Sequence, residues 1–220
     1  MKYLWTEDSK AGYHYWQLIN QYCWGNALIV ESKYNNQQLL EAVRSIADDK
    51  DNTYYIAFDT VFDNMDIMNK YIELCEIATK NPEHIILMDI TCFEESIFCF
   101  DRLIEWTNCK RKDKIHIRQV ILDNFDKHRI AIENIDDDAT LHYLKGFKRY
   151  STERVLKSIT TELTDKDGWS IRGEKMGVCW YKDCCQLIRS DCGLNVNSNM
   201  KGKVKIIEVG KSNGYDKFHI

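Results

Sequence analysis

The sequence predicts an α/β fold, in which a mostly parallel four-stranded sheet is flanked by helices and followed by a smaller helical, cysteine-containing C-terminal region. Two observations predict it. Short apolar runs alternate with amphipathic segments over residues 1–90, and only a few residues link one segment to the next. Strands that alternate with helices in this way pair in parallel, because each helix carries the chain back to the starting edge of the sheet.

The expected strands are short runs of apolar and aromatic residues. They cover residues 2–6, 27–30, 54–58 and 84–88. The run at 27–30 has no polar break, which is typical of a strand covered on both faces.

Apolar residues at helical spacing predict a helix in each interval between these strands. The helices cover residues 9–23, the segment that begins at Asn35 or Asn36, and residues 64–80. Asparagine is a favoured helix N-cap. Pro82, the only proline of the chain, follows the third helix and stops it.

The pattern changes after about residue 100. We expect helices at residues 100–107, 116–132 and 151–164, and a late strand at 204–209. A basic, polar break at residues 109–114 separates the two patterns. We therefore divide the chain into an α/β domain at residues 1–108 and a helical, cysteine-rich region at 109–220.

Composition restricts the function. The chain has 220 residues, 44% of them hydrophobic, and a formal net charge of −4. Nucleic-acid binding through charge alone is excluded, since it needs a basic protein. No signal peptide opens the sequence and no apolar run approaches the ~20 residues that span a bilayer. We expect a cytoplasmic protein with no membrane partner and with reduced thiols.

Carboxylates follow most of the predicted strands. Glu7, Asp59 and Asp89 end three of the four strands, and further carboxylates follow in the loops: Asp63, Asp66, Glu94 and Glu95. The carboxyl ends of parallel strands meet at one sheet edge, where converging carboxylates repel each other unless a cation joins them. Oxygen ligands of this kind suit Mg²⁺ or Mn²⁺. The alternative is that these residues cap helices and form turns, and both interpretations stay open.

Three segments resemble the Toprim domain of topoisomerases, primases and OLD-family nucleases. They are LWTEDSKAGYHYW at 4–16, IAFDTVFDN at 56–64 and IILMDITCFEESIF at 85–98, and the resemblance covers about the first 105 residues. It implies that Glu7 is a metal ligand or general base and that Asp59 and Asp63 bind metal. Glu94 or Glu95 would be an accessory ligand.

The resemblance implies metal-dependent phosphodiester cleavage, with Glu7 and Asp59 catalytic, in a bacterial phage-defence setting. The rival is a catalytically inactive Toprim-like interaction or regulatory protein. It is favoured by the four-residue spacing of Asp59 and Asp63, because Toprim domains usually carry Asp-x-Asp there. A small-molecule binder that uses the strand-end crevice is a third option. No Walker A or GxGxxG loop is present, so any ATPase would be a partner protein.

Two basic clusters are candidates for contacts with a nucleic-acid backbone. The first comprises Lys110, Arg111, Lys112 and Lys114. The second comprises Lys145, Lys148, Arg149 and Arg154, with the aromatic residues Phe147 and Tyr150 interleaved. Lys110, Arg111, Lys112, Lys148 and Arg149 are the predicted phosphate contacts. Basic side chains contact phosphates and aromatic rings stack on bases. A solvated surface is the competing interpretation, because acidic residues outnumber basic ones, 34 to 30.

Four cysteines lie close together at Cys179, Cys184, Cys185 and Cys192. Their gaps of four, zero and six residues do not match the paired spacing of zinc sites. We expect reduced, mostly buried thiols and no zinc.

Overall fold

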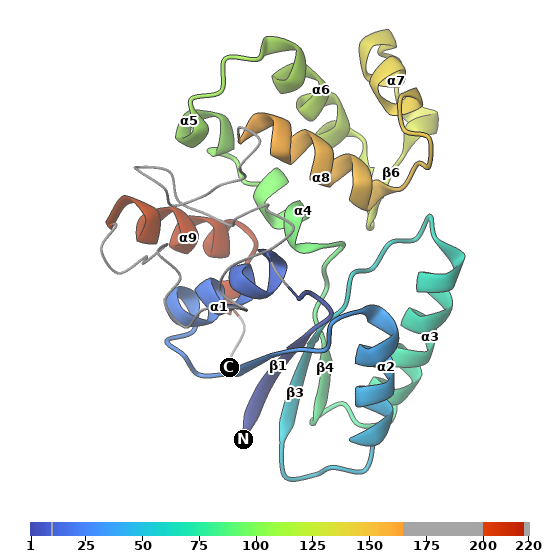
Figure 1. Ribbon diagram of the computed structural model, residues 1–220, viewed down its shortest axis with the longest axis vertical. Coiled ribbons are helices and arrows are strands. Elements are labelled where there is room, and N and C mark those ends of the chain that lie inside the picture. The colour runs from blue at the N-terminus through green and yellow to red at the C-terminus, as the bar shows by residue number, and fades with distance from the viewer. Residues whose placement is uncertain (10, 165–199, 218–220) are drawn as a thin grey trace.

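A computed structural model of the chain, which describes residues 1–9, 11–164 and 200–217, contains a four-stranded, all-parallel sheet (Figure 1). The strands are β1 (Lys2–Thr6), β2 (Ile29–Ser32), β3 (Thr53–Ala57) and β4 (Ile85–Leu87), in the order β2-β1-β3-β4. The predicted α/β class is therefore confirmed, with β1 and β3 in the centre of the sheet.

The crossover helices also form where the sequence predicts them. They are α1 (Ala11–Cys23), α2 (Asn36–Ser45) and α3 (Met65–Lys80). Asn35 caps α2 by accepting a hydrogen bond from the backbone N–H of Gln38, and Asn64 caps α3 in the same way.

The second strand differs from its prediction in two respects. It begins at Ile29 rather than Ala27 and lies at an edge of the sheet, where Ile29 is 45% exposed. The expectation that this strand is covered on both faces is wrong, because an unbroken apolar run of four residues does not distinguish an edge strand from a central one.

Alternate residues of the central strands enter two separate cores. Leu4 and Tyr55 pack with Tyr15 and Trp16 of α1, whereas Trp5 and Ile56 belong to a second cluster with buried residues of α2 and α3. Figure 1 shows α1 on one side of the sheet and α2 and α3 on the other. Successive side chains of a strand point to opposite faces of the sheet, so each face has its own hydrophobic core.

The described residues of the second half of the chain are mainly helical. Its helices are α4 (Phe93–Phe98), α5 (Leu103–Thr107), α6 (Lys112–Asp123), α7 (Asp138–Lys145), α8 (Thr152–Leu163) and α9 (Met200–Ser212), with short 3₁₀ turns at Ile132–Asn134 and Tyr215–Lys217. In Figure 1, α4 and α8 lie beyond the carboxyl ends of the strands.

The predicted helix at 116–132 is wrong in its second part. Helix α6 ends at Asp123, and β5 (Phe125–Asp126) and β6 (Arg129–Ile130) form a tight antiparallel hairpin. Lys127 and His128 turn this hairpin with φ angles of 42° and 66°. Two consecutive residues in the left-handed region are typical of a two-residue hairpin, although Asn and Gly are the usual residues there.

The predicted strand at 204–209 is also wrong, since this segment belongs to α9. Ile206 and Val209, three residues apart, are fully buried in the core that also contains α1. Gly210 allows close contact with α1, because a Cβ atom there would lie 2.3 Å from Sγ of Cys23. A short β-branched run cannot be assigned from its period, and here the helix-on-helix packing decides its structure.

The larger hydrophobic cluster takes residues from both sides of the predicted boundary at 108, from Leu4 to Ile117, Leu156 and Val209. The division into two domains stays a prediction. Cys179, Cys184, Cys185 and Cys192 lie outside the described residues. None of the helices in the described part of the chain is long and apolar enough to span a membrane.

Candidate functional site

The two central strands deliver Glu7 and Asp59 to the same edge of the sheet. Thr6 at the end of β1 pairs with Ala57 at the end of β3. Glu7 follows Thr6 directly, and Asp59 comes two residues after Ala57. The side chains of Glu7 and Asp59 are close enough to share a hydrogen bond. The structure therefore brings together the two residues that the sequence predicts to be catalytic.

Each carboxyl group of this pair has an oxygen without a hydrogen-bond partner among the described residues. These atoms are Oε2 of Glu7 and Oδ1 of Asp59, both buried, and Asp59 as a whole is 7% exposed. Burial, reinforced by the charge of Asp8, raises the pKa of Glu7 to about 8. Burial and the neighbouring Glu7 raise the pKa of Asp59 well above its ordinary value. At neutral pH the pair therefore retains a proton.

Asp8 is held beside this pair by contacts with β1 and α1. Its Oδ2 atom accepts hydrogen bonds from Thr6 Oγ1 at 3.0 Å and from Trp16 Nε1 at 3.3 Å. Gly12 makes room for it, because a Cβ atom there would lie 2.1 Å from the carboxyl carbon of Asp8. Burial raises the pKa of Asp8 to about 6, and the two hydrogen bonds oppose that rise.

Helix α4 contributes Glu94, which is 2% exposed. Burial raises the pKa of Glu94 to about 7, and the ammonium group of Lys157, with Nζ 3.3 Å from Oε1, opposes the rise. Lys157 lies on α8, one turn after Glu153, whose charge raises the pKa of Glu7, Asp59 and Glu94. Sequence reasoning missed Glu153 and Lys157, and their four-residue spacing on one helix face was the only signal.

Asp63, the remaining predicted metal ligand, has a different contact. Its Oδ2 atom accepts hydrogen bonds from the backbone N–H of Thr152 at 2.6 Å and from the Thr152 hydroxyl at 2.9 Å. Thr152 is the first residue of α8, so Asp63 satisfies a free N–H and interacts favourably with the helix dipole.

The other strand-end carboxylates also have protein partners. Asp89 Oδ1 lies 2.7 Å from Nε2 of His128, and Glu95 accepts a hydrogen bond from the backbone N–H of Thr91 at 2.7 Å. These contacts fix the loop after β4 and the β5–β6 hairpin. For Asp89 and Glu95, the interpretation as local structural residues agrees with the geometry.

The two predicted basic clusters lie near opposite ends of α8. Lys148 and Arg149 are exposed and immediately precede the end of α8 that carries Thr152 and Glu153. Arg111 forms an ion pair with Glu162, with its nitrogen and oxygen 2.9 Å apart. Glu162 is about 14 Å along the helix from Glu153 at 1.5 Å per residue. The Lys148 cluster thus lies at the end of α8 that carries Glu153, and Arg111 lies at the other end.

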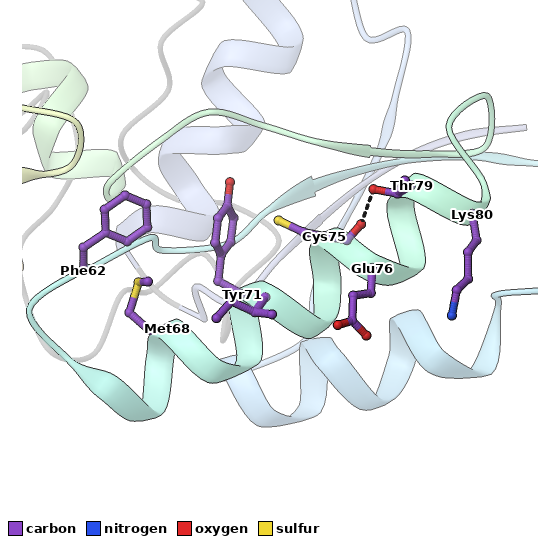
Figure 2. A pocket seen from close by; sticks show the side chains of 8 residues that line it. Phe62, Met68, Tyr71, Cys75, Glu76, Thr79 and Lys80 are labelled. Atoms are coloured by element: carbon purple, nitrogen blue, oxygen red, sulfur yellow. Dashed lines mark hydrogen bonds between the residues drawn. The ribbon is translucent and has the colours of Figure 1, made fainter.

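A hollow of about 510 Å³ lies along α3, away from the carboxylates. Figure 2 shows Phe62 and Met68 at one end of it and Thr79 and Lys80 at the other, with Tyr71 and Cys75 between them. Glu76 is the only carboxylate among its lining residues in the described chain. The hollow therefore lacks the acidic lining that a hard metal ion requires.

Among the residues that the structure describes, no group of three or more His, Cys, Asp or Glu side chains could hold a metal ion. What the described residues offer is the Glu7–Asp59 pair with its unpartnered oxygens. Such a pair fits Mg²⁺, which commonly takes one or two carboxylates from a protein and completes its octahedron with waters and substrate phosphates.

No family model, curated protein or solved structure matches this chain. The likeness to Toprim domains consequently rests on the three sequence segments. The geometry adds an all-parallel sheet with Glu7 and Asp59 after its two central strands.

The raised carboxyl pKa values predict how the metal-free protein responds to pH. Between about pH 4 and pH 8 the folded state holds protons that the unfolded state has released, so these groups lower the free energy of unfolding as pH rises. Asp59→Asn, which resembles the protonated form, gains stability relative to the native chain over that range. We expect the difference to grow by more than ~1 kcal/mol between pH 5 and pH 8, since one pKa unit is worth about that much.

Urea unfolding of chelator-treated protein measures this difference at each pH. Asp101→Asn is the matched control, because Asp101 is exposed and its variant should keep a constant offset from the native chain. A constant offset for Asp59→Asn as well would show that Asp59 is ordinarily ionised.

Proposed function

We propose that this chain is a metal-dependent, nuclease-like protein of the Toprim type, which cleaves a phosphodiester bond at the Glu7–Asp59 pair. The observation that carries the proposal is the pair of buried carboxyl oxygens, Glu7 Oε2 and Asp59 Oδ1, without hydrogen-bond partners among the described residues. Buried polar atoms are almost always satisfied, so an unsatisfied pair calls for an explanation, and a bound water or ion is one of the common explanations.

A bound Mg²⁺ or Mn²⁺ would neutralise charge that develops on the phosphoryl group and would lower the pKa of a water nucleophile. Glu7 and Asp59 would hold that ion, each through its unpartnered oxygen. Once the ion offsets the neighbouring negative charges, the Glu7 carboxylate would also be the group that accepts a proton from the attacking water. Lys148 and Arg149 would contact phosphates that flank the scissile bond.

The resemblance to Toprim domains also suggests the biological context. We propose a cytoplasmic protein that acts on nucleic acid, works with a partner ATPase and takes part in phage defence. Sequence reasoning alone supports these features.

The second candidate is a catalytically inactive interaction or regulatory protein. It is favoured by the contact of Asp63 with Thr152, which commits the third predicted ligand to a helix terminus. In that case Glu7 and Asp59 would be a protonated pair that only stabilises the loops at the strand ends.

Substitution of the pair separates the two candidates. With Mn²⁺ and labelled single-stranded DNA, duplex DNA or RNA, the native chain should cleave at least one substrate. Glu7→Gln and Asp59→Asn should each reduce the rate about 100-fold or more, since each removes a charged oxygen from the ion. Asp63→Asn is the control and should retain most activity, because asparagine still accepts a hydrogen bond from Thr152.

Gel electrophoresis of the products measures these rates. An inactive native chain that also binds no Mn²⁺ would favour the interaction protein. Equal loss of activity in Asp63→Asn would restore Asp63 as a ligand.

The position of the basic clusters predicts unequal effects on nucleic-acid binding. The double variant Lys148→Glu, Arg149→Glu should lower the salt dependence of binding by a slope of about 2, because it removes two phosphate contacts beside the site. The matched variant Lys110→Glu, Lys112→Glu should change it little. Fluorescence anisotropy with labelled DNA across a salt series tests this, and equal slopes for both variants would contradict the placement.

A further inference from the structure

Helix α3 carries a second row of largely apolar side chains, in addition to the face that enters the core. The core face contains Leu74, which is fully buried, with partly buried residues packed around it. The second row, which we call the outer row, recurs at alternating spacings of three and four residues: Met65, Met68, Ile72, Cys75 and Thr79. These are the spacings of the a and d positions in a coiled-coil seam, so the outer row has the pattern that pairs with another helix.

The outer row lies on the surface of the molecule. Met65 is 71% exposed and Ile72 is 50% exposed, and they are two of the five large hydrophobic side chains that are exposed among the described residues. Helix α3 packs against α2 and β4, and in Figure 1 it lies at the edge of the molecule. The row therefore forms an apolar surface that neither of these packing partners covers.

The hollow of about 510 Å³ runs along the outer row. Met68, Ile72 and Cys75 line it, and Figure 2 shows Phe62 at one end and Lys80 at the other. In a helix pair, the side chains of one seam fit into the spaces between side chains of the other. A shallow hollow along a row with this spacing is therefore shaped for the seam of a second helix.

Opposite charges at the two ends of α3 favour an antiparallel partner. Asp66 lies in the first turn and Lys80 in the last turn, on the same flank of the outer row because they are close to four turns apart. Neither forms an ion pair with another described residue, whereas Glu73 between them pairs with Arg44 of α2. A second α3 that runs antiparallel brings its own Lys80 beside Asp66 and its own Asp66 beside Lys80. A parallel copy would bring like charges together.

We propose that α3 is the contact surface of a homodimer, in which two copies of this chain pair their α3 helices antiparallel about a two-fold axis near Ile72. The outer row of each copy fills the hollow of the other, and Asp66 of each copy pairs with Lys80 of the other. One helix of 16 residues on each side makes a small interface, so we expect a reversible dimer with a micromolar Kd. The hollow lies away from the Glu7–Asp59 pair, and the inference does not depend on the proposed function.

Sedimentation velocity across a micromolar concentration range tests the dimer. The native chain should show a reversible equilibrium between monomer and dimer. Ile72→Glu places a charge at the centre of the seam and should remain a monomer at every concentration. Ile72 is half exposed in the single chain, so the variant should fold, which circular dichroism verifies. A native chain that is monomeric throughout, or a dimer unchanged in folded Ile72→Glu, would overturn the proposal.

Charge reversal tests the antiparallel arrangement. Asp66→Lys and Lys80→Glu each bring like charges together at both ends of the interface and should raise the Kd of the dimer about 10-fold. The double variant, and an equimolar mixture of the two single variants, should return close to the native Kd, because every contact then again joins opposite charges. Asp66 and Lys80 are about 21 Å apart within one chain, so this recovery requires pairing between copies.

Lys145→Glu is the control for charge reversal. Lys145 is exposed on α7, and its variant should keep the native Kd. Single variants of Asp66 and Lys80 that dimerise as the native chain does, or a double variant and a mixture without recovery, would overturn the proposed pairing.

Discussion

The burial of several carboxylates at the end of a parallel sheet is the constraint on which the rest of this structure depends. The register of β1 and β3 places Glu7 beside Asp59, and burial then raises the pKa of both groups. Ionised carboxylates in such surroundings are costly unless a proton, a cation or a hydrogen-bond donor neutralises them. The structure supplies all three: a retained proton on the Glu7–Asp59 pair, the ammonium group of Lys157 at Glu94, and hydrogen-bond donors from Thr6 and Trp16 to Asp8. A divalent ion would be a further source of positive charge.

Helix α8 contacts both the hydrophobic core and the carboxylates at the end of the sheet. Its apolar face is buried in the larger hydrophobic cluster, and its polar face presents Glu153 and Lys157 to the carboxylates. Asp63 attaches its first turn to the loop after β3. A helix fixed at so many points holds its charged groups in constant positions, which is what a preorganised electrostatic site requires.

Periodicity and strand order made the central part of this picture predictable. The alternation of apolar strands and helices predicted the sheet, and the meeting of parallel strands at one edge predicted that Glu7 and Asp59 lie together. The roles of Asp63 and Lys157 were beyond sequence reasoning, because each depends on a contact with a segment more than 60 residues away. The segment at 204–209 failed for a related reason, since its packing partner α1 lies near the other end of the chain.

A crystal structure of the native chain soaked in Mn²⁺ tests the central claim most directly, because anomalous scattering locates manganese without assumptions about the ligands. The account predicts an anomalous peak between the carboxyl groups of Glu7 and Asp59, within coordination distance of an oxygen of each. The absence of a peak at this pair in crystals that diffract well, or a peak at Asp63 or Asp89 instead, would contradict it.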